Sequence, residues 1–415
     1  MKNIFKPIMA KKFLITQGLG KLVQTLLTKI RETSPPRGIQ ESTLKWVSTF
    51  ELNEQKDKPK IVEIQINTSP LYLKPKFLEE TIHWKFTLAH QEILERDTNR
   101  HTSTFVVLLY NGRTWSDSAV INAENYLLAE LSKKRLLDKS LKHSIFQKKR
   151  LRPAYRANGI SLNLACESGN NYYHWMFEVL PRTEIIKQAG FSIENIDHFI
   201  VNSYTSAFQY QTLARLGISR EKIIEIEKHS HVSCEKLIAT PRLKATGGNI
   251  GGYFVCNFLQ KEIGSKNTLK NGLKFEKIYI SRAKNHYRQV INETDIIEIL
   301  VNFGFKVFFL ESLSLDEQVT LFASAKIIIA PHGAGLTNIV FCNSGTKLLE
   351  IFSPNYVHVC YWHICNLVGV EYFYLIGEGR RPCDYEPTPF PFPYRDNITI
   401  NINKFRKILN YIGVC

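Results

Sequence analysis

The sequence predicts an α/β protein with two Rossmann-like domains that face a cleft. The chain has 415 residues, which is enough for two such domains. Short runs of β-branched residues alternate with segments of helical spacing, as they do in βαβ units. Small and polar residues follow several of these runs. In a parallel sheet the carboxyl ends of the strands form the ligand crevice, so these residues are candidates for a site.

Residues 1–59 are predicted to form a basic arm and a linker. Residues 1–38 hold eight Lys or Arg and one acid, Glu32, in a chain of net charge +16. Leucine spacing predicts an amphipathic helix over Gln17–Ile30. Such an arm suits an anionic membrane surface, or it steers an anionic substrate by its field. The aromatic residues are not interleaved with the basic runs, so we expect no nucleic acid partner.

The cellular compartment is predicted from three features that the sequence lacks. No apolar run approaches the roughly 20 residues that span a bilayer. Met1–Ala10 has no apolar core of the kind found in signal peptides. The eight cysteines form no Cys-x-x-Cys pair, which favours a reducing compartment. We therefore expect a cytoplasmic location, with peripheral contact to the inner face of the membrane through the arm.

Residues 60–240 are predicted to be the first domain. Its start is rich in strands, with a turn at Asn111-Gly112, and a helix is expected over Glu124–Leu136. Strands and helices alternate after that. The predicted strands are Ile61–Ile66, Thr104–Tyr110, Ser118–Ile121, Ile160–Ala165, His198–Asn202, Lys222–Glu227 and Glu235–Thr240.

The segment Asn170–Arg182 is the candidate catalytic helix of this domain. It follows the strand Ile160–Ala165, and Asn170 or Asn171 is a suitable N-cap. His174 and Glu178 are four residues apart, so they share one helix face. A histidine and a carboxylate together can move a proton, or they can simply stabilise the helix. We assign Glu178 as the general base, with His174 as the alternative.

Residues 241–385 are predicted to be the second domain, and 386–415 a tail with a final helix. The predicted strands are Lys277–Arg282, Lys306–Leu310, Ala325–Ala330, Lys347–Ile351 and Glu371–Ile376. Four glycines, Gly247, Gly248, Gly251 and Gly252, lie where the domains are expected to meet.

The most informative stretch is the turn that follows the strand Ala325–Ala330. Pro331 ends the strand, and the small residues then lead into an apolar helix. The N-terminus of a helix carries partial positive charge and binds phosphate. The predicted contacts of this turn are His332, Gly333, Ala334, Gly335, Leu336 and Asn338.

Charged residues are expected to join this turn from neighbouring strands. Arg282 ends one strand and Arg288 follows it, while Glu350 lies near the end of another. The arginines and the turn suit a diphosphate, and the carboxylate suits ribose hydroxyls. The arrangement therefore predicts a site for a sugar nucleotide.

The second half of the chain resembles glycosyltransferase family 61, over roughly residues 160 to 380. This family includes plant xylosyl- and arabinosyltransferases, O-linked N-acetylglucosaminyltransferases and bacterial members. The matching residues are Ser281-Arg282, Arg288, Asn292-Glu293, Phe303-Gly304-Phe305, Glu317-Gln318, Phe322, Ala325, His332–Asn338 and Glu350-Ile351, with His174, Glu178 and Pro181 in the first domain.

The resemblance implies a GT-B fold, a UDP-sugar donor, inversion at the anomeric carbon and a glycan or lipid-linked acceptor. It thus implies an enzyme of polysaccharide or glycoconjugate biosynthesis, with the last helix crossing back to the first domain. No Asp-x-Asp triplet is present and arginines are available. We therefore expect no metal and no cofactor. The alternative is a non-catalytic protein that binds a nucleotide sugar or a glycan. A dinucleotide-dependent oxidoreductase is disfavoured, because Gly-x-Gly-x-x-Gly is missing.

Overall fold

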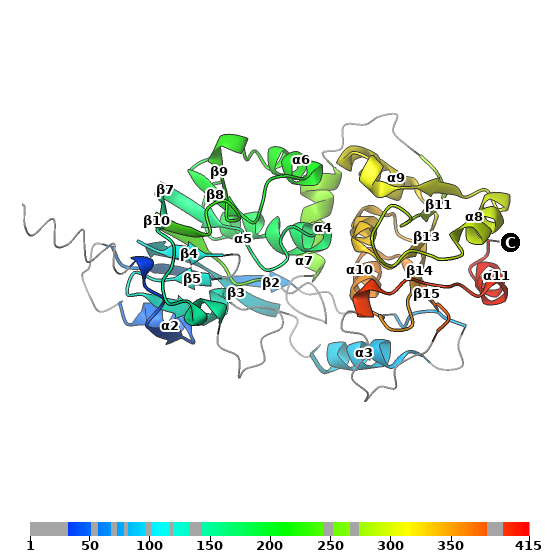
Figure 1. Ribbon diagram of the computed structural model, residues 1–415, viewed down its shortest axis with the longest axis horizontal. Coiled ribbons are helices and arrows are strands. Elements are labelled where there is room, and N and C mark those ends of the chain that lie inside the picture. The colour runs from blue at the N-terminus through cyan, green and yellow to red at the C-terminus, as the bar shows by residue number, and fades with distance from the viewer. Residues whose placement is uncertain are drawn as a thin grey trace, which may run out of the picture.

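The computed structural model describes residues 32–50, 57–67, 73–78, 82–96, 101–116, 119–132, 143–243, 252–265, 274–379 and 393–414. In this part of the chain the protein has a mixed α/β fold with two sheets, which lie in two lobes side by side (Figure 1). The predicted α/β class is confirmed. Among the described helices, none is both long and apolar enough to span a bilayer.

The first sheet is mixed, and its strand order is β1-β6-β5-β4-β10-β7-β8-β9. Strand β3 also pairs with β10, and β2 pairs with β3. Strands β10, β7, β8 and β9 run parallel to their neighbours in this group, as in a βαβ arrangement. The bounds are β1 Gly38–Gln40, β2 Lys60–Asn67, β3 His101–Tyr110, β4 Arg113–Trp115, β5 Ala119–Ile121, β6 Tyr126–Leu128, β7 Tyr155–Asn163, β8 His198–Val201, β9 Ile223–Glu225 and β10 His231–Ala239.

Most described helices of this part are short, and two of them, η3 and η5, are of the π type. The π-helix η3 follows α4 directly, and it is this segment that carries the predicted catalytic pair. Single turns of π-helix occur frequently at functional sites. The bounds are α2 Thr43–Ser48, α3 Trp84–Arg96, α4 Tyr172–His174, η3 Trp175–Val179, α5 Arg182–Gln188, α6 Ala207–Arg215, α7 Gly252–Leu259 and η5 Gln260–Gly264.

The second sheet is entirely parallel, with the order β12-β11-β13-β14-β15. All five strands had been predicted from the sequence, because buried parallel strands form continuous apolar runs. The bounds are β11 Lys277–Ile280, α8 Glu293–Asn302, β12 Lys306–Phe308, α9 Leu315–Ser324, β13 Ile327–Pro331, η7 Ala334–Phe341, β14 Lys347–Phe352, α10 Cys360–Val368, β15 Glu371–Ile376 and α11 Ile402–Tyr411.

Local sequence explains where these elements begin and end. Ser314 and Glu317 form a capping box that starts α9, with each side chain bonded to the backbone of the other residue. Gly369 ends α10 with a φ of 75°, a conformation that glycine adopts without steric cost. The apolar segment after the β13 turn forms a 3₁₀ helix, η7, rather than an α-helix.

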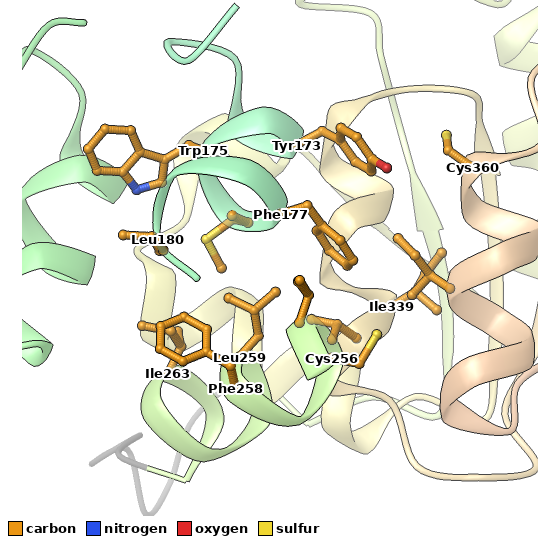
Figure 2. Close-up of a cluster of buried hydrophobic side chains, with 14 of the residues drawn as sticks. Tyr173, Trp175, Phe177, Leu180, Cys256, Phe258, Leu259, Ile263, Ile339 and Cys360 are labelled. Atoms are coloured by element: carbon orange, nitrogen blue, oxygen red, sulfur yellow. The ribbon is translucent and has the colours of Figure 1, made fainter. Parts of the chain in front are cut away.

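One buried hydrophobic cluster runs without interruption from the first sheet to the second. Figure 2 shows the part of it where η3, α7 and η7 meet, with Phe177, Leu259 and Ile339 among the side chains. These three residues have no exposed surface. Burial of this kind stabilises by roughly 1.5–3 kcal/mol per large apolar side chain. The two sheets are therefore held together by a shared core.

The predicted limits of the first domain need one correction. Helix α3 packs on the second sheet, where Figure 1 places it, although it lies within residues 60–240. Phe86 is fully buried and stacks on Tyr374 of β15, with ring centroids 4.7 Å apart. The preceding residues extend this contact, because Lys76 bonds to the backbone of Tyr372 and Tyr374.

Two predicted helices also need correction. Helix α11 does not cross back to the first sheet, because Phe405, Ile408 and Leu409 pack in a separate cluster of the second sheet. The helix expected over Glu124–Leu136 is wrong in its described part, where β6 and the short 3₁₀ helix Ala129–Leu131 take its place. Pairing of β6 with β1 and β5 there outweighs the local helical preference.

Candidate donor and base sites

A pocket of about 220 Å³ lies between the two parts of the chain. Most of its wall comes from the carboxyl ends of β11 and β13 and the segments that follow them. Leu310, Glu311 and Gln318 add to the wall from the second part, and Tyr172 and Phe208 from the first. This is the crevice in which open parallel sheets bind ligands. It includes Arg282, Gly333, Ala334, Gly335 and Leu336 from the predicted donor site.

Arg282 lines this pocket, and its guanidinium group is only partly hydrogen-bonded. Its Nη2 donates to the carbonyl of Tyr287 at 3.0 Å, whereas Nε has no hydrogen-bond partner in the described part of the chain. Burial, together with the nearby charge of Arg288, lowers the pKa of Arg282 to about 10. A buried cation beside a second cation is stabilised by an anionic ligand. A Cβ at residue 333 would overlap Nη1 of Arg282, so the glycine permits this close approach.

Arg288 supports the turn from outside the pocket. Its Nε donates to the carbonyl of His332 at 2.9 Å, and Nη1 donates to the carbonyl of Tyr394 at 2.6 Å. The residue has a φ of 57°, which is uncommon for a long side chain and is found more often at functional sites. Arg288 thus fixes the backbone of the turn beside Arg282.

His332 and Glu350 form a buried pair below the turn. Nδ1 of His332 lies 2.5 Å from Oε1 of Glu350, and the hydroxyl of Tyr372 donates to Oε2 at 2.5 Å. Burial raises the pKa of Glu350 well above 4.5 and lowers the pKa of His332 well below 6.5. Burial therefore favours the uncharged form of each side chain.

This geometry corrects the role predicted for Glu350. The carboxylate has no exposed surface, and both its oxygens already have partners. Ribose hydroxyls cannot reach it, because the protein core surrounds it. Glu350 instead holds the His332 ring in place.

Asn338 connects the two parts of the chain. Its Oδ1 accepts a hydrogen bond of 2.6 Å from Tyr172, and its Nδ2 donates to Gln318 at 2.8 Å. The side chain is fully buried, so it stabilises the wall of the pocket and does not face a ligand. Through Tyr172 it brings the α4 segment to the edge of the pocket.

The predicted catalytic pair is present on the helix segment formed by α4 and η3. Nδ1 of His174 lies 3.0 Å from Oε1 of Glu178, and both side chains are buried. Arg242 approaches Oε2 of Glu178 with Nε at 2.5 Å, and its Nη1 is 3.5 Å from Glu167. Burial lowers the pKa of Arg242, but the carboxylate of Glu178 outweighs this and the net shift is upward.

Several residues of these sites were missed by sequence reasoning. Arg242 follows β10 and is 64 residues away from Glu178, so no local spacing links them. Asn285 and Glu311 line the pocket from loops that follow β11 and β12. Their position after strands that were themselves predicted is the signal that would have found them. Residues 1–31 of the basic arm, Gly247, Gly248 and Gly251 lie outside the described residues.

Comparison with known proteins agrees with this arrangement. The family model for Glycosyltransferase 61 matches residues 172–349, which extend from α4 through β13 and η7 into β14. That segment is similar to the family 61 domain. The predicted resemblance is thus confirmed over the residues that build the pocket.

One curated relative is similar over a shorter segment. It is the EGF domain-specific O-linked N-acetylglucosamine transferase of Drosophila melanogaster, 31% identical over 100 residues. The match covers 23% of this chain and 18% of that protein, so the chain spans less than a fifth of the relative's length. Together the family model and the relative support glycosyl transfer.

Proposed function

We propose that this chain is an inverting glycosyltransferase with a GT-B arrangement, which moves a sugar from a UDP-sugar to a hydroxyl of a glycan. The observation that carries the proposal is the guanidinium of Arg282, which lines the pocket at the strand ends and whose buried Nε has no hydrogen-bond partner among the described residues. Arg288 adds a second positive charge nearby. A cation that lines a crevice, with a second cation close behind it, suits a diphosphate, which arginine binds with charge-assisted hydrogen bonds.

The donor is proposed to lie along the pocket wall. Arg282 and the backbone of Gly333–Leu336 hold the diphosphate, and Glu311, which is exposed in the pocket, takes the ribose role first assigned to Glu350. Arginine charges stabilise the leaving UDP, which is usually the largest contribution to catalysis. For this reason no metal ion is required by the mechanism.

The base is proposed to be His174, with Glu178 as its partner. Both oxygens of Glu178 are already held, one near His174 and one by Arg242. Its second oxygen therefore serves Arg242, and imidazole is the side chain most often used as a general base. His174 removes the proton of the acceptor hydroxyl as that oxygen attacks the anomeric carbon and UDP departs. The carboxylate then stabilises the imidazolium.

Release of UDP tests this function. The full chain is incubated with UDP-sugars, singly, and with a pool of glycan acceptors, and the UDP formed is measured. Acceptor-dependent release that is lost in His174→Asn supports glycosyl transfer. UDP binding without release from any donor would instead leave a non-catalytic nucleotide-sugar-binding protein as the function.

A cytoplasmic location with peripheral membrane contact is also proposed, on the charge of residues 1–38 alone. Basic segments bind anionic lipids with about 1 kcal/mol per Lys or Arg near the surface. Co-sedimentation with phosphatidylserine vesicles, with and without residues 1–38, measures this contact. The charges concerned are Lys2, Lys6, Lys11, Lys12, Lys21, Lys29, Arg31 and Arg37. Equal binding by both chains would remove the proposal.

A further inference from the structure

A second pocket, of about 550 Å³, lies at the carboxyl ends of the parallel strands β7, β8 and β9. We call it the polar pocket. It is distinct from the Arg282 pocket and belongs wholly to the first sheet. Its wall is formed by Ser116, Ser168, Gly169, Asn170, Asn171, Asn202, Ile226, Glu227 and Ser230.

The chemistry of this wall is unlike that of the Arg282 pocket. Its lining residues include amides, hydroxyls and one carboxylate, Glu227, but no cationic and no aromatic side chain. A phosphate would find no positive charge there, and an apolar ligand would find only Ile226. Amides and hydroxyls both donate and accept hydrogen bonds, and a carboxylate accepts from two hydroxyls at once. A neutral ligand with many hydroxyl groups fits this set.

The polar pocket is held in shape by internal hydrogen bonds. Asn202 accepts from the backbone N–H of Cys166 at 3.1 Å and donates to its carbonyl at 2.7 Å, which fixes the loop after β7. A Cβ on Gly169 would overlap the Asn202 amide. Ser203 donates to Asn170 Oδ1 at 2.8 Å, and Nδ2 of Asn170 donates to Glu227. The loop is thus rigid before any ligand arrives, which reduces the entropy lost on binding.

Backbone strain is concentrated at this pocket. Five non-glycine residues of the described chain have positive φ, and two of them, Ser116 at 54° and Ser168 at 64°, line the polar pocket. Asn111 and Asn125 account for two others, and asparagine tolerates this conformation. The fifth is Arg288, beside the donor site. Strained residues of this kind persist mainly at functional sites.

The polar pocket is also next to the donor pocket in the chain. Asn171 lines the polar pocket and Tyr172, the next residue, lines the Arg282 pocket. The same segment continues into His174. We propose that the polar pocket binds a neutral saccharide, the acceptor glycan. Its role as acceptor rests on the proposed function, whereas saccharide binding does not.

Saturation-transfer NMR with neutral glycosides tests this proposal on the full chain. The probes are methyl β-D-glucopyranoside, methyl β-D-galactopyranoside and methyl α-D-mannopyranoside, measured with UDP present to occupy the donor pocket. We expect at least one probe to bind the wild type. Ser230→Tyr fills the pocket from its rim and should abolish the signal. Glu227→Gln preserves the shape and should weaken binding roughly 5- to 10-fold, as expected for the loss of a hydrogen-bond acceptor.

The matched control is Glu221→Gln, an exposed glutamate of the same part that lines no described pocket. It should bind the probes like the wild type. Calorimetry with UDP shows in each variant whether the donor site is intact. Failure of UDP binding in the wild type would contradict the proposed function. The test of saccharide binding would still be valid, because it does not depend on that function. If no glycoside binds the wild type, or if binding survives Ser230→Tyr, the polar pocket is not a saccharide site.

Discussion

The hydroxyl of Tyr172 donates a hydrogen bond of 2.6 Å to Oδ1 of Asn338 and so joins α4 of the first part to η7 of the second. Asn338 has no exposed surface, and Nδ2 of the same side chain is held by Gln318. Burial raises the pKa of Tyr172 far above its ordinary value, so the phenol keeps its proton as a donor. The bond fixes the segment of α4 and η3 against the wall of the Arg282 pocket.

Tyr172→Phe should therefore destabilise the protein. The substitution leaves a buried acceptor on Asn338 unsatisfied, which costs roughly 1–3 kcal/mol. The midpoint of thermal unfolding, measured by scanning calorimetry at one fixed rate, should fall. Tyr210→Phe is the control, because Tyr210 is 38% exposed. Equal midpoints for the two variants would show that the bond contributes nothing.

Phe86→Ala should reveal that α3 belongs to the second sheet. Phe86 is fully buried against Tyr374 and Trp362, and truncation of such a phenylalanine costs roughly 3–5 kcal/mol. Hydrogen exchange should become faster in β15 and α10 and stay unchanged in β7 and β8. Leu88→Ala, at a position that is 48% exposed, is the control. Faster exchange confined to the first sheet would contradict the observed packing.

The His332–Glu350 pair gives the stability of the protein a defined dependence on pH. The pKa of Glu350 is raised from 4.5, so above pH 4.5 the folded state keeps a proton that the unfolded state releases, and stability falls as pH rises. The pKa of His332 is lowered from 6.5, so below pH 6.5 only the unfolded state gains a proton, and stability falls as pH falls. Between these values the two slopes cancel.

Glu350→Gln tests this behaviour. The variant lacks the carboxyl whose pKa is raised. Its stability should therefore fall less steeply above pH 6.5 than that of the wild type, by at most about 1.4 kcal/mol per pH unit. Unfolding midpoints are compared from pH 6.5 to 9. Glu298→Gln, at an exposed position, should follow the wild type. Parallel profiles for the wild type and Glu350→Gln would show that the pKa of Glu350 is not raised in the folded state.

The assignment of the base is tested by two near-isosteric substitutions. His174→Asn should reduce turnover by roughly 10²–10⁴-fold, the contribution of general base catalysis, and leave UDP affinity nearly unchanged. Glu178→Gln should reduce turnover less, because it removes only the group that orients His174 and pairs with Arg242. Loss of turnover in Glu178→Gln with activity retained in His174→Asn would return the role of base to Glu178.

The second sheet was predictable from sequence because its strands are short apolar runs. In Ile327–Pro331, for example, every residue is buried. The pair His174 and Glu178 was predictable for a similar reason, since helical spacing alone brings the two side chains together. What lies within a few residues along the chain can be inferred from periodicity.

Long-range packing could not be inferred in that way. Phe86 reaches Tyr374 and Arg242 reaches Glu178 across large stretches of sequence, and no local pattern encodes those pairs. Glu350 has the position of a ligand-binding residue at the end of β14, yet Tyr372 from the neighbouring strand covers its outer oxygen. Its burial depends on a side chain that only the folded sheet supplies.

Calorimetric titration of UDP into the wild type and Arg282→Ala is the most direct measure of the central claim, that the Arg282 pocket holds the donor diphosphate. Arg406→Ala on α11 is the matched control, because Arg406 is exposed and lies far along the chain from the pocket. The account predicts that Arg282→Ala weakens UDP binding by roughly 1.5–3 kcal/mol, the range for hydrogen bonds to charged groups, and that Arg406→Ala has no effect. UDP affinity equal to that of the wild type in Arg282→Ala would place the donor elsewhere and contradict the account.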